Sequence, residues 1–118
     1  MAQTIVIVND SPYVNMALAK VIKNNADFQV LGHAKSGSDA YTMVQNLRPD
    51  IVLIDSVLPD ALGLHLAKEL KQLNSGLKII LMSAVSNSEA PLVAKSNGAD
   101  YYVLKPLSNN QLISALVA

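Results

Sequence analysis

The sequence predicts a single α/β domain in which helices cover both faces of a five-stranded parallel sheet. Short apolar runs rich in Val, Ile and Leu alternate along the chain with segments of helical periodicity. Continuous apolar runs of this kind are typical of strands that are buried on both faces. The chain has 118 residues, the usual size of one domain with a full hydrophobic core.

Each expected strand is an apolar run that stops at a polar residue or a turn. The runs occupy residues 4–8, 28–34, 51–54, 78–82 and 101–104. Parallel strands need crossover connections, and right-handed crossovers leave few possible topologies. Among these we favour the flavodoxin-like strand order 2-1-3-4-5, which places the first, third, fourth and fifth strands side by side.

A helix is expected after each strand. The first begins at Ser11, a favoured N-cap residue, with Pro12 at the first helical position. Its apolar stripe has helical spacing and consists of Val14, Ala17, Leu18, Val21 and Ile22. The third helix carries the stripe Leu66, Ala67, Leu70 and Leu73. The remaining helices are expected over residues 38–47, 88–97 and 108–117.

Composition excludes several functional classes. Nine basic and nine acidic residues cancel, so the domain has no overall charge that would attract nucleic acid or an anionic membrane. No apolar run approaches the roughly 20 residues of a membrane span. There is no cysteine, and the N-terminus lacks the features of a signal peptide. We therefore expect a cytoplasmic protein that binds neither membrane nor nucleic acid directly.

Polar side chains follow four of the apolar runs at the point where each run ends. They are Asn9 and Asp10, Asp55, Ser83 and Lys105. One polar residue at a strand end commonly marks only the end of the strand. Ligands of open parallel sheets, however, bind beyond the carboxyl ends of the strands, near the switch in strand order. Four adjacent ends with complementary chemistry therefore predict a site.

Two carboxylates suit a hard divalent cation such as Mg²⁺, which commonly retains water and phosphate oxygens as its other ligands. A carboxylate can also act as a nucleophile toward phosphorus and form an aspartyl phosphate. An ammonium group and a hydroxyl can then stabilise the charge on the phosphoryl oxygens.

At these positions the chain resembles the receiver domains of response regulators in two-component signalling. That family has an acidic pair after the first strand and D-x-x-[ML]-P-x-x-x-G after the third. A Ser or Thr followed by a small residue ends the fourth strand, and an aromatic residue stands three positions before Lys-Pro. The chain shows Asn9-Asp10, the stretch DSVLPDALG from Asp55, Ser83-Ala84, and YVLKP from Tyr102. The resemblance covers nearly the whole chain.

The resemblance implies roles for individual residues. Asp55 would be the phosphoacceptor and also a Mg²⁺ ligand, together with Asp10 and the backbone carbonyl of Val57. Asn9 stands where the family usually has an acid that reaches the metal through water.

Lys105 and Ser83 would hold the phosphoryl group, and Tyr102 would be the rotameric switch residue. The bond between Lys105 and Pro106 is expected to be cis.

The implied function is a phosphorylation switch. A histidine kinase or phosphotransfer protein would supply the phosphoryl group to Asp55, and the domain itself would catalyse its phosphorylation and dephosphorylation. The fourth helix, fifth strand and fifth helix would relay the change to an output domain or effector, with transcription as the expected output, and the same face could form a homodimer. Residues 1–118 are expected to be the receiver alone, with any output domain absent.

Two alternatives remain. Asn9 in place of an acid weakens the attraction for Mg²⁺, so a pseudo-receiver that acts as an interaction module without phosphorylation stays open. A dehalogenase-like phosphatase shares the aspartyl nucleophile but usually needs a second acid two residues later. Val57 occupies that position, which disfavours the phosphatase.

Overall fold

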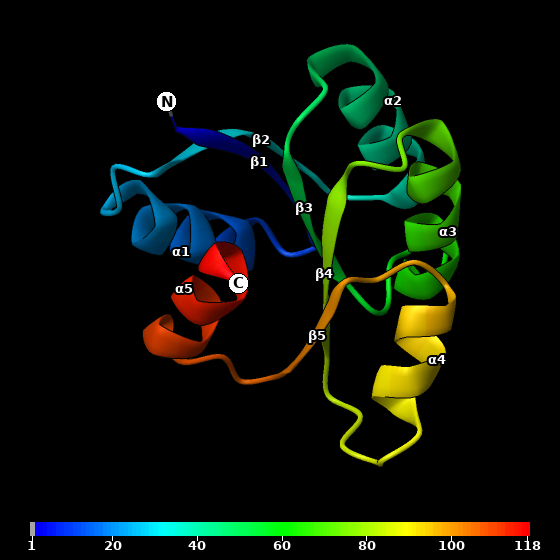
Figure 1. Cartoon of the computed structure of the whole chain (residues 1–118). Coiled ribbons are helices and arrows are strands. Elements are labelled where there is room, and N and C mark those ends of the chain that lie inside the picture. Colours follow the sequence, from blue (N-terminus) through cyan, green and yellow to red (C-terminus); the bar gives the residue numbers. More distant parts are fainter. Residues whose placement is uncertain (1) are drawn as a thin grey trace.

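The computed structural model describes residues 2–118, over which strands and helices alternate from β1 to α5 (Figure 1). The strands are β1 (Gln3–Val8), β2 (Phe28–Ala34), β3 (Ile51–Asp55), β4 (Lys78–Ser83) and β5 (Tyr101–Leu104). The helices are α1 (Pro12–Lys23), α2 (Gly37–Leu47), α3 (Gly63–Leu73), α4 (Ala90–Ser96) and α5 (Asn109–Val117). Within the described residues, no helix combines the length and hydropathy that a membrane span requires.

The strands form one parallel sheet in the order β2-β1-β3-β4-β5, which confirms the predicted fold class and topology. In the register of this sheet, Asp55 lies opposite Met82, and Ser83 lies opposite Leu104. β3 pairs with β1 along its edge opposite to β4. The carboxyl ends of β1, β3, β4 and β5 therefore lie along one edge of the sheet.

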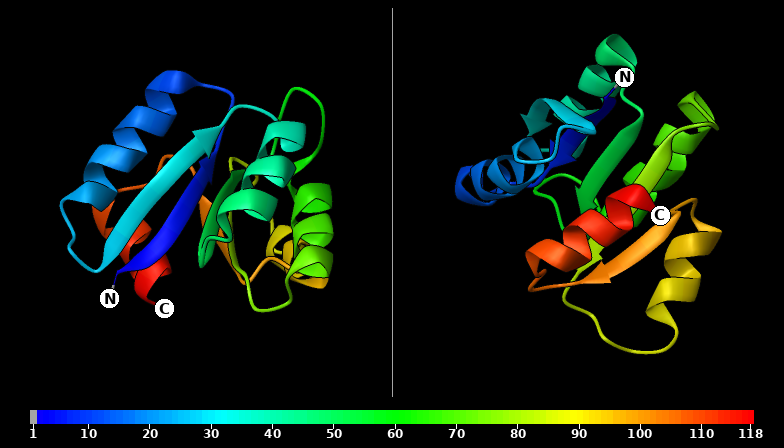
Figure 2. Two further views of the ribbon diagram at one scale, coloured as in Figure 1. Left: turned by 90° about the horizontal axis from the view of Figure 1, so that it is seen from above. Right: turned by 60° about the vertical axis from the view of Figure 1, so that its left-hand side comes forward.

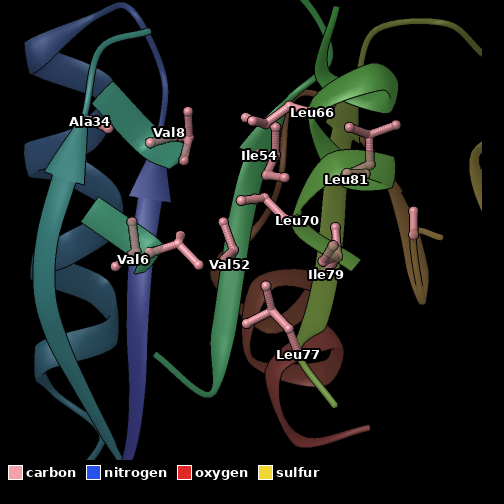
Figure 3. Close-up of a cluster of buried hydrophobic side chains, with 14 of the residues drawn as sticks. Val6, Val8, Ala34, Val52, Ile54, Leu66, Leu70, Leu77, Ile79 and Leu81 are labelled. Atoms are coloured by element: carbon pink, nitrogen blue, oxygen red, sulfur yellow. The ribbon is translucent and has the colours of Figure 1, made fainter. Parts of the chain in front are cut away.

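Successive strand residues point into two apolar layers on opposite faces of the sheet, because side chains alternate along a strand. Helices α2, α3 and α4 cover the face formed by Val6, Val8, Val52, Ile54, Ile79 and Leu81 (Figure 3). Helices α1 and α5 cover the face formed by Ile5, Ile7, Ile51, Leu53, Ile80 and Met82 (Figures 1 and 2). β1 and β3 are thus buried on both faces, as their continuous apolar runs predict.

Hydrogen bonds of the caps explain where the helices begin. The Ser11 hydroxyl accepts the amide of Val14 at 3.4 Å, and Pro12 is the first helical residue, as predicted. Ser108 and Gln111 form a capping box at the start of α5, in which each side chain accepts the other residue's amide. The helix α4 is shorter than the sequence predicts, since it begins at Ala90 and ends at Ser96.

The orientation of α1 differs from the predicted stripe. Asn15 is fully buried, whereas Val14 is exposed. The reason is a hydrogen bond of 2.8 Å from the side-chain Nδ2 of Asn15 to the main-chain carbonyl of Asn9, which turns this polar residue toward the end of β1. The buried positions Asn15 and Ile22 are seven residues apart, so they lie on one side of the helix.

Lys78 connects the start of β4 to the C-terminal turn of α5. Its ammonium group donates to the carbonyls of Leu116 at 2.7 Å and Ala118 at 2.8 Å, and it lies 5.0 Å from the centre of the Tyr101 ring. Partial burial lowers the pKa of Lys78 below its ordinary value, despite the opposing effect of Asp100.

Candidate functional site

The buried polar side chains of residues 2–118 gather at one place in the fold. Four polar residues are buried, namely Asn9, Asn15, Asp55 and Ser83. Three of them, Asn9, Asp55 and Ser83, stand at the carboxyl ends of β1, β3 and β4. The fourth, Asn15, lies on α1 and its side chain donates to the main-chain carbonyl of Asn9. Burying a polar group is costly unless it is hydrogen-bonded. Their concentration at the predicted edge therefore marks this edge as a site rather than as a place where strands simply stop.

Asp55 forms an ion pair with Lys105, in which Nζ contacts Oδ1. Asp55 is only 5% exposed, and its Oδ1 is buried with no regular hydrogen bond besides this ion pair. Lys105 follows β5 directly, and its main-chain amide donates to the carbonyl of Ser83 at 2.8 Å. This bond continues the pairing of β4 and β5. It places Lys105, at the end of β5, where its side chain reaches across β4 to the Asp55 carboxylate at the end of β3. The Lys105–Pro106 bond is cis, as expected.

Ser83 and Tyr102 both bind the main chain of Val85, in the loop that follows β4. The Ser83 hydroxyl oxygen accepts the Val85 amide at 3.1 Å, and the Tyr102 hydroxyl donates to the Val85 carbonyl. Because the Ser83 oxygen acts as acceptor in this bond, its proton remains available for another acceptor. The predicted phosphoryl-binding hydroxyl and the predicted switch residue are therefore joined through one peptide segment.

Asn9 is held at the end of β1 by three hydrogen bonds. Its side-chain oxygen accepts the Ser11 amide at 2.9 Å, its carbonyl accepts the Asn15 side chain, and its amide donates to Ala34 at 3.0 Å. The carboxamide oxygen of Asn9 thus stabilises the turn that leads into α1. A carbonyl oxygen has a second lone pair, so this arrangement is compatible with a contact through water.

The remaining groups suit a Mg²⁺ ion. Asp10 is exposed directly after β1, and Asp55 ends the adjacent β3, so the two carboxylates occupy neighbouring strand ends. Among the described residues no group of three or more His, Cys, Asp or Glu side chains could hold a metal. Two carboxylates with main-chain oxygen would be a set of donors that fits Mg²⁺, because this ion keeps several water ligands.

The loop between β3 and α3 is tightly folded against Asp55. Val57 pairs with Leu62 in an isolated bridge, and the Gly63 amide donates to the Ser56 carbonyl at 2.8 Å. A Cβ atom at Gly63 would overlap the Asp55 carbonyl oxygen, so only glycine allows α3 to begin this close to the strand.

Sequence reasoning missed two residues near this edge. Asn15 is a polar residue beside an apolar stripe, and this was the signal that could have suggested its burial. Asp60 accepts hydrogen bonds from the amides of Gly37 and Ser38. These partners precede it by 23 and 22 residues, so no local pattern indicates the contact.

Comparison with known proteins agrees with this geometry. Residues 5–117 match the family model described as the response regulator receiver domain. This chain belongs to that family. The receiver domain is 30% identical over 116 residues to the chemotaxis protein CheY of Thermotoga maritima, covering 98% of this chain and 96% of CheY. It is 34% identical over 119 residues to the DNA-binding response regulator MtrA of Mycolicibacterium smegmatis, covering all of this chain and 50% of MtrA.

Solved structures show the same architecture. A LuxR-family two-component response regulator from Aurantimonas sp. SI85-9A1 superposes with a TM-score of 0.93 at 26% identity, covering 99% of this receiver domain and 84% of that chain. The domain thus spans nearly the whole of CheY and about half of the longer DNA-binding relative. Receiver domains generally bind Mg²⁺ at their phosphorylation site, and response regulators of this family act with histidine kinases and output domains.

Proposed function

We propose that this receiver domain is a switch that accepts a phosphoryl group on Asp55 from a histidine kinase or phosphotransfer protein. The observation that carries the proposal is the buried Asp55 carboxylate paired with Lys105 at the edge where the buried polar side chains gather. A nucleophile beside a fixed cation is the arrangement that phosphoryl transfer requires, since catalysis rests mainly on positioning and charge stabilisation.

In the proposed reaction, a carboxylate oxygen of Asp55 attacks the phosphorus of a phosphohistidine. The new bond joins oxygen and phosphorus while the phosphorus–nitrogen bond breaks, and its electron pair stays on the departing imidazole. The Lys105 ammonium offsets the phosphoryl charge from its place beside Asp55. The Ser83 hydroxyl donates a hydrogen bond to another phosphoryl oxygen. Hydrolysis of the product by water returns Asp55 to its carboxylate form.

Mg²⁺, when bound, would be held by Asp10, Asp55 and the Val57 carbonyl, and it would add positive charge at the phosphoryl oxygens. Asn9 contributes no negative charge, so we expect weaker Mg²⁺ binding than an acid at this position would give.

The proposed relay runs through Val85. When the Ser83 hydroxyl turns toward the phosphoryl group, the peptide segment that it holds moves with it, and the Tyr102 hydroxyl follows the Val85 carbonyl. Tyr102 packs against the core on the side of α2, α3 and α4, so its movement alters the junction of β5 with α4. A local charge event would thereby bias a two-state surface.

The surface expected to respond consists of α4, β5 and α5. It exposes several apolar side chains, namely Leu92, Val93, Tyr101 and Leu104. We propose that this surface contacts an output domain, an effector or a second receiver. The similarity to the DNA-binding response regulator MtrA, of which this domain covers 50%, supports transcription as the output.

The test is phosphorylation by acetyl phosphate in the presence of Mg²⁺, followed by intact-mass measurement. One phosphoryl addition is expected in the parent protein and in Asp39→Asn, which removes an exposed carboxylate, but none in Asp55→Asn. An addition that persists in Asp55→Asn would refute the assignment of the nucleophile.

The interaction module without phosphorylation is the second candidate, and the substitution of an acid by Asn9 favours it. It predicts no addition at saturating Mg²⁺ while the α4–β5–α5 surface still binds its partner.

A further inference from the structure

Asp60, in the loop between β3 and α3, binds the first turn of α2. Its Oδ1 accepts the Gly37 amide at 2.7 Å, and its Oδ2 accepts the Ser38 amide at 3.0 Å. Hydrogen bonds to a charged acceptor are stronger than neutral ones. These two bonds lower the pKa of the Asp60 carboxyl below its ordinary value, with the Gly37 bond as the larger cause. The carboxylate is therefore charged at neutral pH.

Asp60 completes the hydrogen bonding of the α2 N-terminus. The amides of the first helical turn have no partners within a helix. Here Ser36 supplies its hydroxyl to the Asp39 amide at 3.1 Å, and Asp60 supplies both oxygens to the two amides between them. A Cβ at Gly37 would lie 3.2 Å from the Ala61 Cβ and 3.3 Å from the Asp60 Oδ1. The loop and the helix thus meet in close contact at a glycine.

The same loop carries the main-chain oxygen of Val57. The end of the loop is fixed where Gly63 packs on the Asp55 carbonyl. The turn within the loop is closed by the Leu58 amide, which donates to the Ala61 carbonyl at 3.0 Å. Val57 itself is 64% exposed, so packing of its own side chain does little to hold its peptide group. The bonds of Asp60 fasten the tip of the loop to a separate element, α2.

We propose that Asp60 is a positioning residue of the phosphorylation site. By anchoring the tip of the β3–α3 loop to α2, it fixes the loop that presents the Val57 carbonyl, and it thereby sets the affinity of the site for Mg²⁺. This inference rests on the proposed function of Asp55. Asp60 occupies one of the unspecified positions in D-x-x-[ML]-P-x-x-x-G, so the family pattern gives it no role.

Calorimetric titration with Mg²⁺ tests this role. Asp60→Ala should raise the dissociation constant for Mg²⁺ about tenfold, at the low end of the effects seen when partners of metal ligands are removed. Asp60→Asn should show a smaller rise, because an amide oxygen can accept one amide but its NH₂ group opposes the other. Asp39→Asn removes a charge from the same helix turn without cutting the link, so its affinity should match the parent.

Amide hydrogen exchange without metal provides a second readout. The Leu58 amide should exchange faster in Asp60→Ala and at the parental rate in Asp39→Asn. The inference is overturned if a folded Asp60→Ala variant keeps the parental Mg²⁺ affinity and the parental Leu58 exchange rate and shows only a lower unfolding temperature. Asp60 would then be a helix cap alone. A parent protein that takes no phosphate and binds no Mg²⁺ would remove the proposed function together with the metal role of Asp60.

Discussion

Gly63→Ala should destabilise the domain at the point where α3 leaves the site. The new Cβ would overlap the Asp55 carbonyl oxygen and lie 2.9 Å from both Leu81 Cδ1 and Ser56 Cα. Reaching an ordinary contact distance from the Asp55 oxygen requires the helix start to move by more than about 1 Å. Neither backbone can yield easily, because Asp55 belongs to a central strand and the Gly63 amide is bonded to Ser56.

The expected loss of stability combines two terms. Overpacking of this kind costs about 1–3 kcal/mol, and loss of the hydrogen bond to Ser56 costs about 1 kcal/mol. With a urea dependence of about 2 kcal/mol per molar, a total of about 2–4 kcal/mol lowers the unfolding midpoint by about 1–2 M. The domain should also accept phosphate more slowly, since the displaced atoms adjoin Asp55.

Urea unfolding followed by circular dichroism measures this effect, with Gly76→Ala as the matched control. A Cβ at Gly76 meets only Asn74 Oδ1 at 3.5 Å, an ordinary contact, and its backbone lies outside the left-handed region. The control should be neutral or more stable by up to about 1 kcal/mol, because alanine restricts the unfolded chain. If the free energy of unfolding of Gly63→Ala lies within about 0.5 kcal/mol of the parental value, the close-approach argument is wrong.

Three further predictions concern charge, lifetime and pH. Asn9→Asp should tighten Mg²⁺ binding at least about fivefold in a calorimetric titration, because one added unit charge about 4 Å away is worth about 1 kcal/mol even in water; equal affinities would contradict this. Val57 and Val85, 64% and 50% exposed, cannot orient an attacking water, so phosphate loss should be slower in the parent than in Val57→Asn with Val85→Glu, measured by radiolabel decay. The folded-state pKa of Lys78 is below 10.5, so between that pKa and pH 10.5 the unfolded state binds more protons than the folded state. Stability relative to Lys78→Met should therefore rise as pH rises through the folded pKa toward 10.5 in urea titrations, and parallel curves would refute the linkage.

The strands and their polar ends were predictable because both depend on local sequence, and the strand order because right-handed crossovers leave few topologies. Apolar runs specify buried strands, and a polar residue after each run identifies the edge at which parallel strands finish. Asp55 and Lys105 were placed at one edge by this reasoning, and the ion pair between them confirms the placement. The roles of these residues in phosphoryl transfer stay predictions.

The orientation of α1 and the link between Asp60 and α2 were not predictable in the same way. In α1 the buried side chain of Asn15 is bonded to the main chain at the end of β1, a contact between separate elements. The Asp60 link joins segments more than 20 residues apart, so it appears only once the loops are placed in space. Both contacts depend on tertiary structure that periodicity does not encode.

In the proposed switch, the two main-chain bonds of Val85 would separate the lifetime of the phosphorylated state from the transmission of the signal. Ser83 and Tyr102 hold the amide and carbonyl of this residue, which every amino acid except proline possesses in full. The Val85 side chain takes part in neither bond and is half exposed to solvent, close along the chain to Ser83. In the proposed switch, residue 85 can therefore be exchanged to lengthen or shorten the phosphorylated state while both main-chain bonds are kept, and among the amino acids only proline would remove the bond to Ser83.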